Sequence, residues 1–364
     1  MQKLGVSNLI RGATFFQHAG VSIVYIFMPI LAQNLTTSIF EVGLTIASFF
    51  LAQILSSMYF GRVSDTRGKR LVFIRAGFLG CAVMFGLHYV VDDSLYLLLV
   101  RLGSGVTSGM LVPAMLAYTY ESGKDKSKVA SVISFHALGW LAGIVGAGIA
   151  NNEKTIFLIS AALFLVGFAL TSRLPNYEIV KEVSATRQVI VKNKYLFLSL
   201  LLRHTGATAV WTILPLVLTQ TFGAKLYEVS IVYVANTVTA FILMNLMGTK
   251  IHIENTTKFK IGVGLTVFVF VGMSLMSSWW MAIPSMALVG FTWAFLYIGG
   301  SIHLMENNPK STSTGIFNST ISIANVIGPV TAGTIAFYYN DISVMYFAIA
   351  ICTVAFIISL KIKK

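Results

Sequence analysis

The sequence predicts an all-α polytopic membrane protein whose twelve transmembrane helices form two pseudo-symmetric six-helix bundles. Three observations lead to this fold class: few charged residues, apolar segments of bilayer-spanning length along the whole chain, and a repeat between the two halves. Of the 364 residues, 56% are hydrophobic and 11% are charged, whereas a soluble domain carries about 25% charged residues. Because such a chain cannot cover a water-facing surface, we expect it to be surrounded by lipid.

The apolar segments come in two groups of six. A helix needs about 20 mostly apolar residues to cross a bilayer, and segments of this kind occupy residues 9–31, 40–60, 72–91, 94–118, 129–150, 155–173, 195–219, 227–247, 259–277, 279–304, 311–336 and 340–360. The longest polar connection separates the sixth from the seventh. We therefore expect a first bundle in residues 1–173, a cytoplasmic linker in residues 174–194 and a second bundle in residues 195–364.

The net charge of +13 follows the predicted topology. If the N-terminus is cytoplasmic, the basic residues of the connections fall almost entirely inside, and only Lys154 and Lys225 lie in outside connections. This asymmetry is the positive-inside pattern of membrane proteins. It predicts that both termini are cytoplasmic, that the protein lies in the cell (plasma) membrane, and that nucleic acid is not a partner.

The second half of the sequence repeats the first at a nearly constant offset. Phe40-Glu41-Val42 matches Tyr227-Glu228-Val229, and Gly61 matches Gly248, both at an offset of 187 residues. Further matches at an offset of 185 residues are Gly105 with Gly290, Gly143 with Gly328, and Gly148 with Gly333. Six spans separate the copies, so both copies run in the same direction, as parallel repeats do in transporters.

The connection between the second and third spans carries the most specific motif, Gly61-Arg62-Val63-Ser64-Asp65-Thr66-Arg67-Gly68-Lys69-Arg70. Its glycines, aspartate and basic residues resemble the loop signature of the major facilitator superfamily. The resemblance implies that Asp65 and Arg67 latch the two halves in the outward-open state, and we expect Glu121 to be the partner of Arg67. The predicted gating residues are Gly61, Asp65, Arg67, Gly68, Lys69, Arg70 and Glu121. The alternative is a basic loop that only sets topology.

Two glycine patterns are less specific. Arg101-Leu102-Gly103-Ser104-Gly105 resembles the pattern of that family's fourth helix. The glycines of the fifth span resemble the pattern of drug/proton antiporters, although Ile144 replaces the expected proline and Ala147 a glycine. Small residues at this spacing also allow helices to pack closely. We expect a helix-packing role for Gly105, Gly139, Gly143, Gly148, Gly328, Pro329 and Gly333.

Ionisable residues inside spans are candidates for function, because burying them in a bilayer is costly. His18 lies seven residues before Tyr25, and His204 lies seven residues before Trp211. Positions i and i+7 share a helix face, so the first and seventh spans are predicted to present matching faces around a central site. The predicted substrate-binding residues are His18, Tyr25, Arg101, His136, Trp140, Arg203, His204 and Trp211.

All thirteen Asp and Glu residues fall in connections or near the ends of spans. Arginine and histidine without a carboxylate favour an anionic ligand, and a guanidinium matches a carboxylate or phosphate well. The sequence therefore predicts a secondary transporter that moves a small organic anion or polar metabolite by alternating access, with a proton as a candidate coupling ion. The alternatives are a multidrug efflux proton antiporter of the same superfamily and a non-transporting membrane receptor or scaffold.

Other kinds of function have no support in the sequence. Cys81 and Cys352 lie inside apolar segments and are predicted to be packing residues, and no metal-ligand spacing is present. The chain has no nucleotide-binding loop and no grouping of a nucleophile with a base. We therefore expect no enzyme activity, cofactor or metal, and a monomeric protein.

Overall fold

A computed structural model describes residues 2–25, 28–35, 39–123, 126–150, 153–177 and 186–363 of the chain. Within these residues the chain is almost entirely helical and contains no β-strand, in agreement with the predicted all-α class. The chain forms two compact units. Unit 1 comprises Met1–Val189 and Met305–Ser319, and unit 2 comprises Ile190–Leu304 and Thr320–Lys364.

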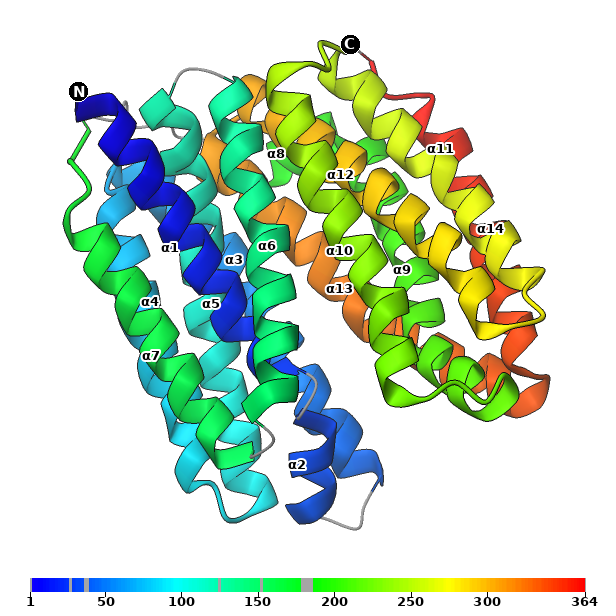
Figure 1. The fold of residues 1–364 in the computed structure, drawn as a ribbon. Helices are drawn as coiled ribbons and strands as arrows, with labels where there is room; N and C mark the ends of the chain where they lie inside the picture. The colour runs from blue at the N-terminus through cyan, green and yellow to red at the C-terminus, as the bar shows by residue number, and fades with distance from the viewer. Residues whose placement is uncertain are drawn as a thin grey trace. The chain divides into compact units, whose positions relative to one another are not determined.

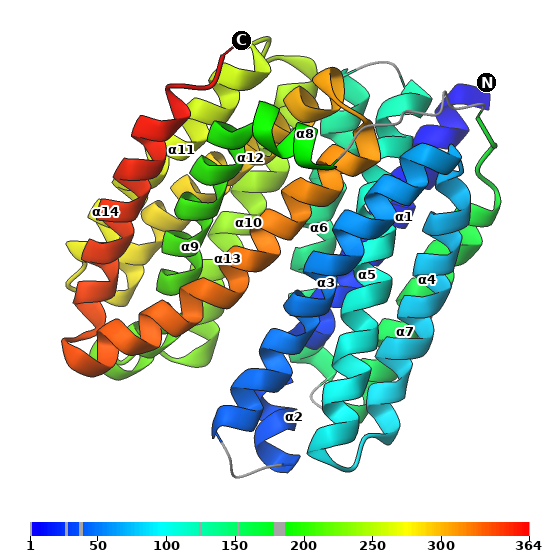
Figure 2. The same ribbon diagram turned by 180° about the vertical axis from the view of Figure 1, so that it is seen from behind.

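Unit 1 contains most helices of the first half of the chain. They are α1 (Gln2–Tyr25), α2 (Met28–Leu35), α3 (Ile39–Arg67), α4 (Arg70–Leu87), the short η1 (His88–Val90), α5 (Ser94–Gly123), α6 (Lys126–Ala150) and α7 (Glu153–Ser172). In this unit α1 packs on α6 and α7 (Figure 1), and α5 packs on α3 and α4 (Figure 2).

Unit 2 contains most of the second half. Its helices are α9 (Lys194–Leu216), the π-helical turn η2 (Val217–Thr221), α10 (Leu226–Thr249), α11 (Asn255–Ser274), η3 (Trp279–Met281), α12 (Ala282–Asn307) and α14 (Asp341–Ser359). The long helix α13 (Lys310–Tyr338) begins in unit 1 and continues in unit 2. The core of unit 2 surrounds the buried side of α9 and η2, where Val210 and Leu214 of α9 and Leu218 of η2 are closed off from solvent.

Eleven helices of the described chain are long and apolar enough to cross a membrane, and each corresponds to one predicted span. The remaining prediction, residues 9–31, falls on α1 and α2 and includes residues 26 and 27, which lie outside the described residues. The clearest difference is at α3, which continues seven residues past the predicted end at residue 60. The apolar run stops before polar residues such as Arg62 and Asp65, so hydrophobicity alone places the end of the span too early. These residues do not interrupt the backbone hydrogen bonds of the helix.

The linker begins with an anchored segment. The Tyr118 hydroxyl donates a hydrogen bond of 2.8 Å to the Pro175 carbonyl, and the Arg75 guanidinium donates to the Thr171 carbonyl at the end of α7. Further on, the linker contains the short helix α8 (Thr186–Lys192). The predicted domain boundaries at residues 173 and 195 stay a prediction.

The sequence repeat corresponds to a repeat of helix packing inside each unit. In unit 1, Gly143 of α6 lies against Ala19 and Ile23 of α1. In unit 2, Gly328 of α13 lies in the same way against Thr205 and Ala209 of α9. A shared hydrogen bond has the same pattern, since Ser22 donates to the Gly139 carbonyl and Thr208 donates to the Ala324 carbonyl. This helix contact is therefore repeated in the two halves of the chain.

This packing predicts different outcomes for two glycines of α6. A Cβ atom on Gly143 would lie 2.7 Å from the Ala19 carbonyl oxygen, whereas one on Gly146 would meet only the end of the Ile23 side chain, at 3.5 Å. Overpacking costs about 1–3 kcal/mol, while alanine is about 1 kcal/mol better than glycine inside a helix. We expect Gly143→Ala to lower the midpoint of thermal unfolding in detergent and Gly146→Ala to maintain or raise it. Equal midpoints for both variants would contradict the close approach of α6 and α1.

Candidate functional site

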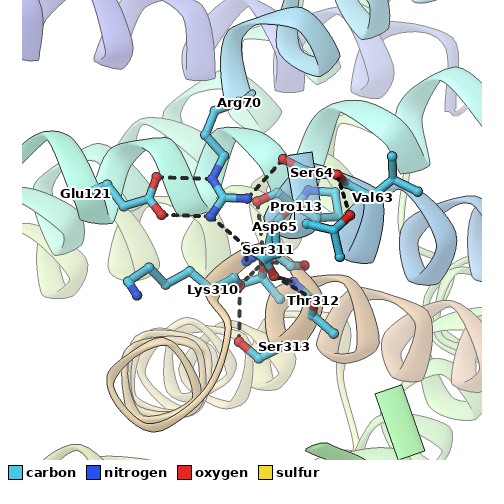
Figure 3. Close-up of polar contacts among 12 residues, drawn as sticks. Val63, Ser64, Asp65, Arg70, Pro113, Glu121, Lys310, Ser311, Thr312 and Ser313 are labelled. Atoms are coloured by element: carbon cyan, nitrogen blue, oxygen red, sulfur yellow. Dashed lines mark hydrogen bonds and ion pairs between the residues drawn. The ribbon is translucent and has the colours of Figure 1, made fainter. Parts of the chain in front are cut away.

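The end of α3 carries a buried carboxylate that caps another helix. Asp65 is 1% exposed. It accepts hydrogen bonds from the backbone N–H groups of Ser311 at 3.2 Å and Thr312 at 2.5 Å, and from the Thr312 hydroxyl at 2.6 Å (Figure 3). These residues form the first turn of α13, whose N–H groups have no partner within their own helix. Asp65 therefore acts as an external cap, and its charge also meets the positive end of the helix dipole.

Arg70 connects this carboxylate to a second one. Arg70 is the first residue of α4. Its guanidinium Nη2 lies 2.6 Å from Asp65 and 2.7 Å from Glu121, and its Nε donates to Glu121 at 3.1 Å. Nη1 donates to the Ser64 hydroxyl at 3.0 Å (Figure 3). One buried cation thus joins the ends of α3 and α5 with bidentate geometry, which is the arrangement that makes a buried ion pair favourable.

The expected partner of Glu121 was wrong: the structure pairs Glu121 with Arg70 instead of Arg67. Arg67 and Lys69 are exposed. The reason is the turn at Gly68, which has a φ of +64° and reverses the chain after α3. Glycine suits this position, since it adopts a positive φ without strain. The reversal brings Arg70 back to Asp65, whereas Arg67 lies two residues past Asp65 on another face of α3.

Gly61 allows α3 and the start of α13 to touch. A Cβ atom on Gly61 would lie 2.5 Å from the Ser311 carbonyl oxygen, and one on Gly315 would collide with the Ser57 carbonyl. Further along the same contact, Asn318 donates to the Ser57 hydroxyl at 3.0 Å. The cap at Asp65 is thus the end of a close, hydrogen-bonded helix crossing.

Within unit 1, the structure brings four of the predicted substrate-binding residues together. The rings of His18 on α1 and His136 on α6 are stacked, with centroids 3.6 Å apart and planes 9° apart. Two turns further on, Tyr25 contacts Trp140 edge to face at 5.6 Å. His18 and Tyr25 therefore share a helix face, as predicted, and that face meets α6.

Arg101 on α5 is also buried in unit 1. Its guanidinium carbon lies 4.6 Å from the centroid of the Phe49 ring on α3, and its Nε has no hydrogen-bond partner among the described residues. The charge of Arg101 acts on the Tyr25 phenol, which relates it to the ring group of α1 and α6. A cation held against an aromatic face retains part of its capacity for an anion.

In unit 2, Arg203 is 2% exposed and is held by hydroxyl groups. Its Nε donates to Thr266 on α11 at 2.9 Å, and Nη2 donates to Thr292 on α12 at 3.1 Å. The guanidinium also lies over the Trp293 ring, 5.9 Å from its centroid. Thr266, Thr292 and Trp293 are neutral, so they do not cancel the charge of Arg203.

The predicted match between the faces of His18 and His204 is only partial. His204 contacts Trp293 of α12 at 5.4 Å and is hydrogen-bonded to Asn325 of α13, whereas Trp211 contacts Phe270 of α11 at 6.0 Å. His204 and Trp211 therefore meet different helices, unlike His18 and Tyr25. One face of α9 borders several helices in the core of unit 2, so the spacing of seven residues does not fix a common neighbour.

Of the predicted packing glycines, Gly105, Gly139, Gly143 and Gly328 lie against a neighbouring backbone, and Gly333 does not. Gly105 and Gly139 are closed by the backbone of α3 and α1, and Gly328 is closed by α9, while Pro329 lies inside α13. A Cβ atom on Gly333 would meet nothing within 4 Å, so packing does not require glycine there. The surroundings of Gly148 and Gly248 lie outside what the structure describes.

The sequence did not predict the partners of Asp65 or those of Arg203. Ser311 and Thr312 stand at the start of a predicted span, directly after Pro309 and Lys310, and Ser and Thr are typical of helix starts. That signal places a helix end, but it does not indicate that Asp65 caps it. Thr266, Thr292 and Trp293 lie inside apolar segments and have no pattern that distinguishes them from packing residues.

Eleven helices of membrane-spanning length in the described chain, a helix contact repeated in both units, a capped turn at the end of α3 and buried cations indicate a polytopic membrane transporter. Residues 12–329 match the sequence model of the Major Facilitator Superfamily, so the chain belongs to this superfamily. It transports a small solute as other members of the superfamily do.

Relatives and solved structures agree with this assignment. The chain is 24% identical to multidrug resistance protein MdtG of Proteus mirabilis, over 93% of this chain and 90% of that protein. It is 23% identical to the proton-coupled antiporter flippase LtaA of Staphylococcus saprophyticus, over 86% of each chain. The crystal structure of the human organic anion transporter MFSD10 (TETRAN) covers 99% of this chain with a TM-score of 0.84 and 13% identity, which shows the fold alone.

Proposed function

We propose that this transporter moves small amphipathic organic anions by alternating access. The observation that carries this proposal is the distribution of charge. Arg101 in unit 1 and Arg203 in unit 2 are buried among aromatic rings, while in the described helices every carboxylate lies in a first or last turn. A guanidinium selects a carboxylate, sulfonate or phosphate, and the rings accept an apolar body.

Each unit contributes one group of residues to this proposal. In unit 1 the group is His18, Tyr25, Arg101, His136 and Trp140; in unit 2 it is Arg203, His204 and Trp293. Trp211 lies apart from the second group, against Phe270. The positive-inside distribution of the loops supports cytoplasmic termini and a cell-membrane location, which would place the cap at Asp65 on the cytoplasmic side.

A dye-flux experiment tests the substrate class. Liposomes containing the purified protein are loaded with carboxyfluorescein, an aromatic anion, or with ethidium, an aromatic cation. We expect faster release of carboxyfluorescein than from protein-free liposomes and no change for ethidium, because the buried cations Arg101 and Arg203 repel a positively charged substrate. Release of ethidium without release of carboxyfluorescein would overturn the anion proposal.

That opposite outcome would favour the second candidate, a multidrug efflux proton antiporter. MdtG and the pneumococcal pump PmrA, which is 29% identical over 43% of this chain, are named for drug resistance, and LtaA is named as proton-coupled. The close contact of Gly139 and Gly143 with α1 also fits the glycine pattern of drug/proton antiporters. A protective effect against lipophilic cations in growing cells would support this candidate.

A further inference from the structure

The two stacked imidazoles of unit 1 form an arrangement that an anion-binding role alone does not require. His18 and His136 lie face to face at 3.6 Å, on adjacent helices that belong to the same unit. The stack depends on the close approach of α1 and α6, because Gly139, one turn after His136, leaves room for the Phe15 carbonyl and the His18 Cβ atom. Imidazole is the side chain that gains and loses a proton near neutral pH.

Charged neighbours set the number of protons that this pair can hold. On α1, Arg11 donates to Ser131 of α6 at 2.8 Å, about two turns before the pair. On α5, Arg101 acts on Tyr25, two turns after the pair. Both are cations, so a first proton on the pair is already opposed, and a second would place two positive charges 3.6 Å apart.

Among the described helices packed around the pair, the carboxylates lie only at helix ends. The carboxylates on α1, α5, α6 and α7 are Glu121 and Glu153, both in end turns, and Glu121 is bonded to Arg70. From α7, the groups that reach α1 include Phe164, Leu170 and Ser160, and the cation of that helix, Lys154, lies over the ring of Tyr89. The side chains of Lys126 and Lys128, at the start of α6, lie outside what the structure describes.

From this geometry we propose that His18 and His136 together form a binding site for a single proton. One imidazolium stacked on one neutral imidazole is favourable, because the neutral ring presents its π face to the cation. The two rings titrate as a coupled pair and not as independent groups. A proton held here adds positive charge beside Arg101 and Tyr25, so it promotes binding of an anion in the same unit.

The use of this proton in transport depends on the proposed function, but proton binding itself does not. This separates the two hypotheses experimentally, since proton binding can be measured without any substrate. Trp140 supplies the probe: its ring centroid lies 6.5 Å from that of His136, and a protonated imidazole quenches indole fluorescence more strongly than a neutral one.

The experiment is a pH titration of the fluorescence of the purified full-length protein in detergent, between about pH 4 and 8. Subtracting the signal of the Trp140→Phe variant removes the contribution of the other four of the five tryptophans. We expect the difference signal to fall on acidification with the slope of one proton. His136→Phe, which keeps a flat ring in the stack, is expected to remove this change.

His18→Phe is expected to shift the midpoint of the titration, since His136 would then stack on a ring that takes no proton. His204→Phe is the matched control: it removes a histidine that also lies beside a tryptophan, Trp293, but in unit 2, and it should leave the difference signal unchanged. A flat difference signal, a two-proton slope, or an unchanged midpoint in His18→Phe would each overturn the single-proton site. If the titration is intact but the dye flux does not depend on pH, the pair binds a proton that is not coupled to transport.

Discussion

Asp65→Asn is expected to lower transport about tenfold or more, which corresponds to at least about 1.4 kcal/mol, while the protein still folds. The carboxylate accepts three hydrogen bonds from the first turn of α13 and pairs with Arg70. An asparagine has the same shape but only one acceptor oxygen, and its amide hydrogens would face N–H donors. Each charge-assisted hydrogen bond contributes roughly 1.5–3 kcal/mol. The substitution would therefore remove most of the stabilisation that Asp65 gives to the first turn of α13.

The measurement is initial dye flux in liposomes, normalised to reconstituted protein. Asp92→Asn, an exposed carboxylate in the turn before α5, and Arg67→Ala, an exposed cation beside the cap, are matched controls that should retain wild-type flux. Wild-type flux in Asp65→Asn would contradict a role for the cap in transport. Loss of flux in Arg67→Ala would restore the original expectation for that residue.

A cysteine at the start of α13 can show whether Asp65→Asn frees the first turn of α13 from the end of α3 or unfolds the whole protein. Ser313 is fully buried in the first turn of α13, and the native Cys81 and Cys352 are fully buried as well. We expect the Ser313→Cys variant to react faster with a maleimide when Asp65→Asn is also present, with one thiol labelled per chain. Labelling of all three thiols would indicate general unfolding instead.

The fold could be predicted from the sequence because its signals are strong and additive. Bilayer-length apolar segments, basic connections and a repeat with offsets of 185–187 residues all indicate the same architecture. The turn at Gly68 was also predictable, since a glycine between Arg67 and Lys69 suits a reversal between two helices. Here local chemistry determines local structure.

The partners of the charges could not be predicted in this way. Asp65 bonds to Thr312, which lies 247 positions further along the chain, and no pattern around either residue specifies the other. Glu121 was expected to bind Arg67 because both are charged and near the same membrane face, but the positive φ at Gly68 determines that Arg70 faces inward. Whether Arg67 or Arg70 is buried depends on the backbone dihedral angle at Gly68 and on packing. Neither can be deduced from the types of residue in the motif.

Arg203→Ala is expected to lower the transport rate about a hundredfold or more, without loss of folded protein. A hundredfold change corresponds to about 2.7 kcal/mol in activation free energy. A buried arginine is costly, and this one is held by Thr266 and Thr292. Those hydroxyls also donate to the carbonyls of Gly262 and Val289 in their own helices. Removing the guanidinium therefore leaves no stranded carboxylate and little unsatisfied polarity, so the structure does not depend on the charge.

The control and the graded variant make this prediction specific. Arg173→Ala removes an exposed arginine after α7 and should leave dye flux unchanged. Arg203→Lys keeps a charge but cannot reach threonines on both α11 and α12 with a fixed fork, so an intermediate flux is expected. Size-exclusion profiles and thermal midpoints check folding in each variant. Wild-type carboxyfluorescein flux in Arg203→Ala would show that this cation serves packing alone, and the charge argument for an anionic substrate would then depend on Arg101.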